Sequence, residues 1–222
     1  MKRWRWLIKT PLLLVALSVA LVTLLRWVPV RYTPVMLKRT IQFSGDGLYQ
    51  SNMEWVPLEK ISPELINAVV VAEDQRFYTH HGFDWSEIKS MWRAHRLEGA
   101  QMRGCSTLSQ QTAKNVFTFG TPTIFRKVAE AYWTVLIELI WGKRRILEVY
   151  LNVAEMGRGL YGAEAASRYY YGVPAHRLDR KQAVSLAICL PQPLFLCPDC
   201  LGGFGKNRYK QLIETSYRYD GY

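Results

Sequence analysis

Two glutamates and several basic side chains cluster in three short motifs between residues 73 and 130. The motifs are Glu73-Asp74-x-x-Phe77-x-x-His80-x-Gly82, Gly104-Cys105-Ser106-Thr107-x-x-Gln110-Gln111-x-x-Lys114-Asn115 and Arg126-Lys127-x-x-Glu130. Chemistry on a sugar phosphate needs a carboxylate that takes a proton from a hydroxyl and cations that hold the departing anion. The sequence therefore predicts a general base beside an anion-binding patch.

Glu73 falls on a helix predicted to begin with Ser62 as its N-cap and Pro63 at its first position. Apolar residues recur on this helix at offsets of three and four, and Glu73 shares their stripe, which should face the core. Burial and the negative end of the helix dipole both raise the proton affinity of such a carboxylate, as suits a base. The alternative is a buried glutamate paired with Arg76 or Lys114, and the helix alone does not choose between the two.

The second motif predicts a helix whose N-cap is Ser106 or Thr107 and whose polar residues Ser106, Gln110 and Lys114 follow one another along one face. A helix start with free backbone N–H groups, and a lysine two turns later, favours binding of an anion such as a diphosphate. The alternative is a solvated surface helix.

The third motif lies on a helix predicted from about Pro122 to Gly142, where Arg126 and Lys127 precede Glu130 by four and three residues. An ordinary ion pair within the helix explains that spacing. The remaining positions are largely apolar, which predicts a buried helix with the core residues Val128, Tyr132, Val135, Leu136 and Leu139.

A further helix is predicted to follow, with Glu148 and Asn152 paired on the side away from its core face. Its core face consists of Ile146, Leu147, Tyr150, Leu151 and Ala154.

Residues 1–31 are interpreted as a cytoplasmic N-terminus and a transmembrane anchor. Thr10 to Leu25 is uncharged and about 24 Å long as a helix, and Leu7 to Val28 reaches about 33 Å against ~30 Å of hydrocarbon. Three tryptophans, Trp4, Trp6 and Trp27, would lie at the interfaces, and the basic N-terminus would keep the rest of the chain outside the cytoplasm. A cleaved signal peptide is the alternative, but no small-x-small site follows Leu25.

The rest of the chain carries 23 basic against 18 acidic residues, so its net charge of +5 is too mild to indicate nucleic acid binding. Residues 32–57 are predicted to be an extended connector with one short hairpin, residues 58–194 one domain, and residues 195–222 a tail without an assigned role. The cysteines leave pairing open: Cys197 and Cys200 form either a local disulfide or two free thiols, and Cys105 and Cys189 have no predicted partner.

The motifs resemble those of the peptidoglycan glycosyltransferases of glycosyltransferase family 51 in its monofunctional, membrane-anchored form. The resemblance covers about Trp55 to Pro193 and includes two further blocks in the family's order. These blocks are Ile146-Leu147-Glu148-x-Tyr150-Leu151-Asn152 and Gly162-x-x-x-Ala165-Ala166-x-x-Tyr169-Tyr170-x-Gly172.

This resemblance implies a mainly α, lysozyme-like helical domain with a membrane-contacting lobe, preceded by one transmembrane helix. It implies an enzyme of the periplasmic face of the bacterial inner membrane that joins lipid II to a growing glycan strand, inverts the anomeric centre and releases undecaprenyl diphosphate. The partners implied are lipid II, the nascent strand and membrane lipids, with other cell-wall synthesis or division proteins left open. A lytic glycosidase and a non-catalytic membrane-tethered scaffold remain the alternatives.

The resemblance also implies residue roles. Glu73 matches the general base, and Glu130 matches a second glutamate of less settled role. The residues implied in diphosphate binding are Ser106, Gln110, Gln111, Lys114, Asn115, Arg126 and Lys127. No residue is implied as a metal ligand; a divalent cation, Mg²⁺ or Mn²⁺, bound with the diphosphate is left open as a cofactor. Cys105 departs from the family, which usually has glycine or alanine there.

Overall fold

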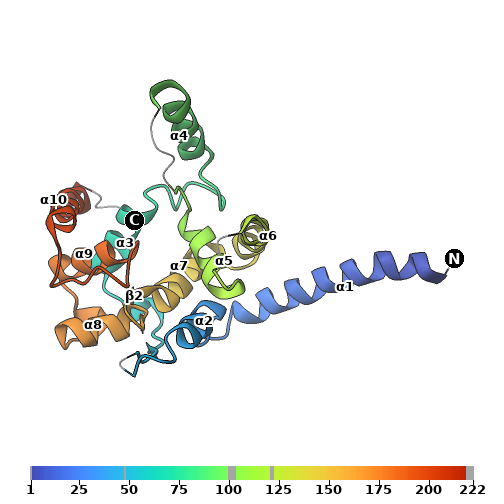
Figure 1. Ribbon diagram of the computed structural model, residues 1–222, viewed down its shortest axis with the longest axis horizontal. Helices are drawn as coiled ribbons and strands as arrows, with labels where there is room; N and C mark the ends of the chain where they lie inside the picture. Colours follow the sequence, from blue (N-terminus) through green and yellow to red (C-terminus); the bar gives the residue numbers. More distant parts are fainter. Residues whose placement is uncertain (1, 48, 100–103, 121–122, 219–222) are drawn as a thin grey trace.

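The computed structural model describes the backbone of residues 2–47, 49–99, 104–120 and 123–218, and the side chains of the same residues except 2–8, 204, 217 and 218. Over these ranges the chain is mainly helical, as predicted (Figure 1). The helices are α1 (Lys2–Leu25), α2 (Pro34–Gln42), α3 (Pro63–Glu73), α4 (Trp85–Glu98), α5 (Leu108–Phe117), α6 (Ile124–Ile140), α7 (Gly142–Val153), α8 (Ala163–Tyr171), α9 (Arg180–Cys189) and α10 (Gly203–Arg218).

A small sheet and two 3₁₀ turns complete the described structure. The sheet has the order β1-β3-β2, with β1 (Asn52–Met53) parallel to β3 (Leu160–Tyr161) and β2 (Glu155–Gly157) antiparallel to it; the turns are η1 (Leu58–Lys60) and η2 (Ala175–Arg177). After β3 the chain turns at Gly162, where φ is +82° and an added Cβ would lie 2.4 Å from the carbonyl oxygen of Asn152. Only glycine fits this backbone without strain.

Helix α3 begins where its sequence predicts and ends at Glu73. Ser62 caps it by accepting from the N–H of Glu64, and Pro63 occupies the first turn. Helix α3 packs on α9, and its buried residues are Leu65, Ala68, Val69, Val70 and Val71. Glu73 is the last residue of α3, so its carboxyl group lies at the negative end of the helix dipole.

The core between α5, α6 and α7 confirms the predicted face of α7, because Ile146, Leu147, Tyr150, Leu151 and Ala154 are all buried. The prediction for the other side is wrong. Asn152 is fully buried and bonds both the N–H and the carbonyl group of Val56, while Glu148 accepts from the N–H of Leu58. These side chains hold an extended segment that has no neighbouring strand to satisfy it.

Helix α6 is exposed where the sequence predicted a core helix. Val128, Val135 and Leu139 are 66%, 47% and 77% exposed, and Tyr132 is also exposed. Glu130, Thr134 and Ile137 form the buried side instead. The predicted start at Pro122 lies outside the described residues. The apolar residues of α6 indicate a helix that avoids water, but they do not distinguish contact with the protein core from contact with lipid or a partner.

Helix α1 extends away from the body, but its C-terminal end is attached to α6 and α7 (Figure 1). Trp141 donates its indole N–H to the carbonyl oxygen of Val22 at 2.7 Å, and Arg145 donates to the carbonyl oxygens of Leu25 and Val28. Within the part of the chain that the structure describes, no helix has both the length and the apolar character needed to cross a bilayer. The interfacial positions predicted for Trp4 and Trp6 lie outside the described side chains.

The extended connector predicted for residues 32–57 is wrong at residues 34–42, which form α2. The signal lay in the sequence: Thr33 accepts from the N–H of Met36 as an N-cap, and Pro34 starts the helix. No hairpin forms within the described part of this segment, because β1 pairs with the distant β3.

The C-terminal tail, which had no predicted role, forms α10 and packs on α3 and α9 (Figure 1). Cys197 and Cys200 form a disulfide in the loop before it, whereas Cys105 and Cys189 are free.

Candidate active site

A cleft of about 980 Å³ opens at the end of α3 and contains Glu73. Its walls are the segment from Val71 to Arg76, the side of α4 that carries Glu87 and Met91, and the loop from Gly104 to Thr107. Helix α4 stands out from the body and has no buried residue (Figure 1).

Glu73 is held by one strong hydrogen bond and one longer ion pair. Its Oε2 accepts from the amide of Gln111 at 3.0 Å, and its Oε1 lies 3.5 Å from a guanidinium nitrogen of Arg208. The hydroxyl of Tyr150 donates to the Gln111 amide oxygen at 3.1 Å, which orients the amide so that its NH₂ faces Glu73. Glu73 Oε1 is buried and accepts no hydrogen bond from the described residues.

Burial raises the pKa of Glu73 above its ordinary value, and the bond from Gln111 and the charges of Arg208 and Lys114 only partly offset that rise. Neither partner in the alternative interpretation forms the ion pair: Arg76 pairs with Asp84, and Lys114 acts on Glu73 through its electric field. A carboxylate with a raised pKa and an unused oxygen is suited to accept a proton.

Asp74, the residue after Glu73, joins α3 to the start of α5. It accepts from the N–H of Leu108 at 2.9 Å and from His80 Nε2 at 2.9 Å. His80 Nδ1 accepts from the N–H of Gly82, which leaves the ring proton on Nε2 facing Asp74. This buried network fixes the end of α3 against the second motif.

The start of α5 differs from the predicted anion site. Thr107 is the N-cap and forms a capping box with Gln110, whose side chain accepts from the N–H of Thr107. The N–H of Leu108 is already used by Asp74, and that of Gln110 by Thr107. The prediction of free N–H groups is therefore wrong for these residues, and Gln110 serves the cap. Asn115 is buried on α5, one turn after Gln111.

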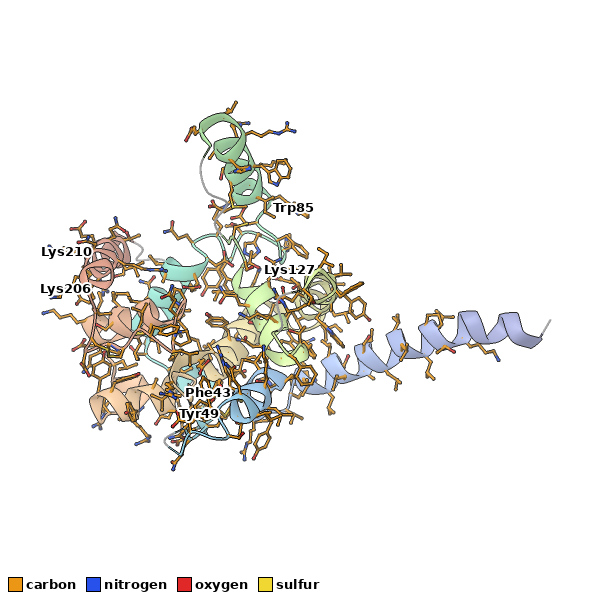
Figure 2. All side chains as sticks on the ribbon, viewed as in Figure 1. Phe43, Tyr49, Trp85, Lys127, Lys206 and Lys210 are labelled. Carbon is orange, nitrogen blue, oxygen red and sulfur yellow. A yellow bond between two sulfur atoms is a disulfide. The ribbon has the colours of Figure 1, made fainter. Side chains whose placement is uncertain are left out.

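The cations of the third motif lie around Glu130 as predicted. Arg126 bonds Glu130 Oε1, and Lys127 Nζ lies 3.0 Å from Glu130 Oε2 and also donates to Ser106 Oγ at 3.0 Å. Lys127 is labelled in Figure 2, where it lies between α6 and the start of α5. Since Glu130 is 1% exposed and has a cation paired with each oxygen, it holds the two basic side chains in place.

Lys114 belongs to the same positive region. Burial lowers its pKa, and the neighbouring charges of Arg126 and Lys127 lower it further. Arg126 Nε is buried and donates to no described residue. The site thus has an unused buried acceptor on Glu73 and an unused buried donor on Arg126.

Across the described ranges, no group of three His, Cys, Asp or Glu side chains is placed to hold a metal ion. The second acidic residue, Glu130, already has cations on both oxygens.

Arg208 is the site residue that the sequence did not reveal. It lies on α10, donates to the carbonyl oxygen of Ala72 at 3.3 Å and faces Glu73 across 135 residues of chain. Only the positions of basic residues within the tail could have indicated it, and Lys206 and Lys210 on the same helix point outward instead (Figure 2).

Comparison with known proteins identifies the family of this chain. The family model Transglycosylase matches residues 38–214, beyond both ends of the predicted domain. A biosynthetic peptidoglycan transglycosylase of Pseudomonas putida is 49% identical over 182 residues, which are 81% of this chain and 76% of that protein. Proteins of the same name from Rhodospirillum centenum and Yersinia pseudotuberculosis are 48% and 39% identical, over 89% and 98% of this chain and 81% and 91% of their own lengths. The chain belongs to the transglycosylase family.

Proposed function

We propose that this chain is a peptidoglycan glycosyltransferase in which Glu73 is the general base. The acceptor is the 4-hydroxyl of lipid II, and the donor is the lipid-linked growing strand. Glu73 takes the hydroxyl proton as the oxygen bonds to the donor's anomeric carbon, and the bond from that carbon to the diphosphate breaks with inversion. The strand grows by one disaccharide, and undecaprenyl diphosphate leaves with the bonding electrons.

One observation supports this assignment: the site contains a buried acceptor on Glu73 and a buried donor on Arg126, and neither forms a hydrogen bond with a described residue. Glu73 Oε1, which has only the 3.5 Å ion pair with Arg208, and Arg126 Nε are each shielded from water without a hydrogen-bond partner among the described residues. An unsatisfied buried polar group costs ~1–3 kcal/mol, so such groups call for a functional reason. A substrate that brings a hydroxyl proton to Glu73 and a phosphate oxygen to Arg126 satisfies both.

The leaving diphosphate is held by the cations from α5 and α6. In the proposal Lys114, Arg126 and Lys127 balance the charge that grows on the diphosphate, and Ser106 donates to it in place of accepting from Lys127. Gln111 keeps its contact with Glu73, and Gln110 stays in the helix cap. A lytic glycosidase has no use for this cationic cluster.

In the proposal a divalent cation enters only together with the diphosphate; among the residues that the structure describes, no three His, Cys, Asp or Glu side chains are placed to hold one. The proposed steps need none.

Peptidoglycan synthesis places the protein in the cell envelope. We extend this to the outer face of the cytoplasmic membrane, with residues 1–31 as the anchor and a lysozyme-like domain whose α6 side contacts lipid. Support comes from the exposed apolar side chains of α1, such as Leu12, Leu14 and Leu17, and from Ile124 and Phe125 on α6, which are 72% and 83% exposed. Phe119 is also exposed, whereas Phe117 stacks on Trp133 in the protein.

The test is Glu73→Gln, measured as glycan polymerisation from labelled lipid II by the full-length protein in detergent. The amide cannot take the proton, so we expect activity to fall by at least ~10³-fold while lipid II binding stays within about threefold. Glu87→Gln is the matched control, because Glu87 is an exposed carboxylate in the same cleft. Polymerisation by the Glu73 variant at the control's rate would refute the base assignment.

A further inference from the structure

A second groove, separate from the active-site cleft, opens where the chain leaves α1. It has a volume of about 760 Å³ and lies between α2, the segment around β1 and Phe119, which follows α5. Its apolar lining includes Met36, Leu37, Met53, Trp55 and Phe119. It shares no lining residue with the cleft that holds Glu73. The volume falls in the range of sites that take small amphiphilic ligands.

The rim of this groove carries one basic and one acidic side chain, which differ in their partners. Arg31 and Glu54 are its two charged lining residues. Glu54 lies 3.5 Å from Arg168, which also pairs with Glu164 at 2.7 Å, whereas Arg31 forms no ion pair with any residue that the structure describes. The groove therefore offers an apolar surface with one available guanidinium, which fits a ligand with an apolar chain and an anionic head.

The place of the groove in the fold is fixed by Arg145. This side chain donates to the carbonyl oxygens of Leu25 and Val28 at 2.8 and 2.6 Å, and its guanidinium lies over the ring of Trp55 at 5.0 Å. The end of α1 is thus fastened to one wall of the groove. If α1 is inserted in lipid, as the proposed function has it, Arg31 lies just past the end of the inserted helix, at the depth of the lipid headgroups.

We propose that this groove binds one anionic phospholipid of the membrane, with its phosphate on Arg31 and an acyl chain along Met36, Leu37 and Phe119. The exposed side chains Leu37 and Phe119, at 55% and 58%, would lose their contact with water on binding. Met36 and Leu37 of helix α2 line this groove. Arg39 of the same helix pairs with Glu155, and its charge helps to lower the pKa of Lys114. The bound lipid therefore rests on a helix that also borders the catalytic cations.

The experiment measures binding of dioctanoyl phosphatidylglycerol to the full-length protein in a neutral detergent, by native mass spectrometry and by titration. We expect one lipid per chain and at least fivefold weaker binding of dioctanoyl phosphatidylcholine. Arg31→Gln should weaken phosphatidylglycerol binding roughly tenfold, the effect of losing one charged hydrogen bond. Leu37→Trp, which fills the groove from an exposed position, should weaken it as well.

Arg26→Gln is the matched control, because Arg26 is another basic residue at the end of α1 but stacks on Trp27 outside the groove. It should bind the lipid within twofold of the wild type. Equal binding by the Arg31 variant, equal binding of phosphatidylcholine, or displacement of the lipid by millimolar inorganic phosphate would each overturn the proposal.

Binding in detergent requires neither catalysis nor an inserted α1. Glu73→Gln should therefore bind phosphatidylglycerol as the wild type does. A failure here would leave the polymerisation mechanism intact, and a failure of the mechanism would leave this site intact.

Discussion

Replacing Arg208 with alanine should change the pH dependence of the reaction, because Arg208 is the cation nearest to Glu73. Its positive charge favours the ionised carboxylate and so lowers the pKa that burial raises. Without it, Glu73 holds its proton to a higher pH. The acidic limb of the kcat/KM profile, which reports ionisation of the base in the free enzyme, should therefore move to higher pH.

The size of this shift follows from the geometry. Two unit charges 3.5 Å apart interact by about 1 kcal/mol in the dielectric of water and about 5 kcal/mol at the effective dielectric of a protein site. The Arg208 side chain is 27% exposed, so solvent screening favours the lower part of that range. We take ~1.5 kcal/mol, which is about a tenfold change in proton affinity and moves the limb by roughly one pH value.

The assay is the rate of polymerisation of labelled lipid II between pH 5 and 9. Arg208→Lys should restore most of the wild-type profile because it keeps the charge. Lys210→Ala is the control, as Lys210 lies on the outer side of the same helix (Figure 2). An unmoved acidic limb in the alanine variant, with the fold intact by circular dichroism, would show that Arg208 does not tune Glu73.

Three further outcomes can be measured directly. Glu130→Gln should lower the free energy of unfolding by about 3 kcal/mol and abolish activity, because its two basic partners are left without a buried counter-charge. Urea unfolding measures the loss of stability. Gly162→Ala should lower the free energy of unfolding by more than ~2 kcal/mol, because the new Cβ clashes with the carbonyl group of Asn152. An unchanged urea midpoint would show that this position is not strained. Iodoacetamide at pH 8 should label native Cys105 and spare Cys189, whose pKa burial raises to about 12, as peptide mapping would show.

The features that the sequence predicted well are those set by neighbouring residues. The cap at Ser62 and the ion pairs of Arg126 and Lys127 with Glu130 arise within one or two helical turns. The same local rule, a threonine N-cap followed by proline, predicts α2 as well, although the prolines and glycines of residues 32–57 favour an extended segment. The core face of α7 was predictable because its apolar residues recur at helical spacing on a single side of the helix.

The features that were missed depend on contacts between distant segments. Arg208 meets Glu73 only because α10 folds back over α3, and no spacing in the chain encodes that return. The N–H of Leu108 is taken by Asp74, which lies 34 residues earlier, so the helix start looked free in the sequence. Likewise, an apolar period marks a helix face as water-avoiding but does not say what covers it, as α6 illustrates.

The attachment of α1 to the body bears on how soluble versions of this enzyme are made. The indole of Trp141 and the guanidinium of Arg145 end on backbone carbonyls of Val22, Leu25 and Val28. A version trimmed to begin at residue 30 would strip these buried donors of their acceptors, at ~1–3 kcal/mol for each that water does not reach. Residues 22–28 are structurally part of the catalytic body. A truncated protein that begins before residue 22 should therefore be more stable to unfolding than one that begins at residue 30.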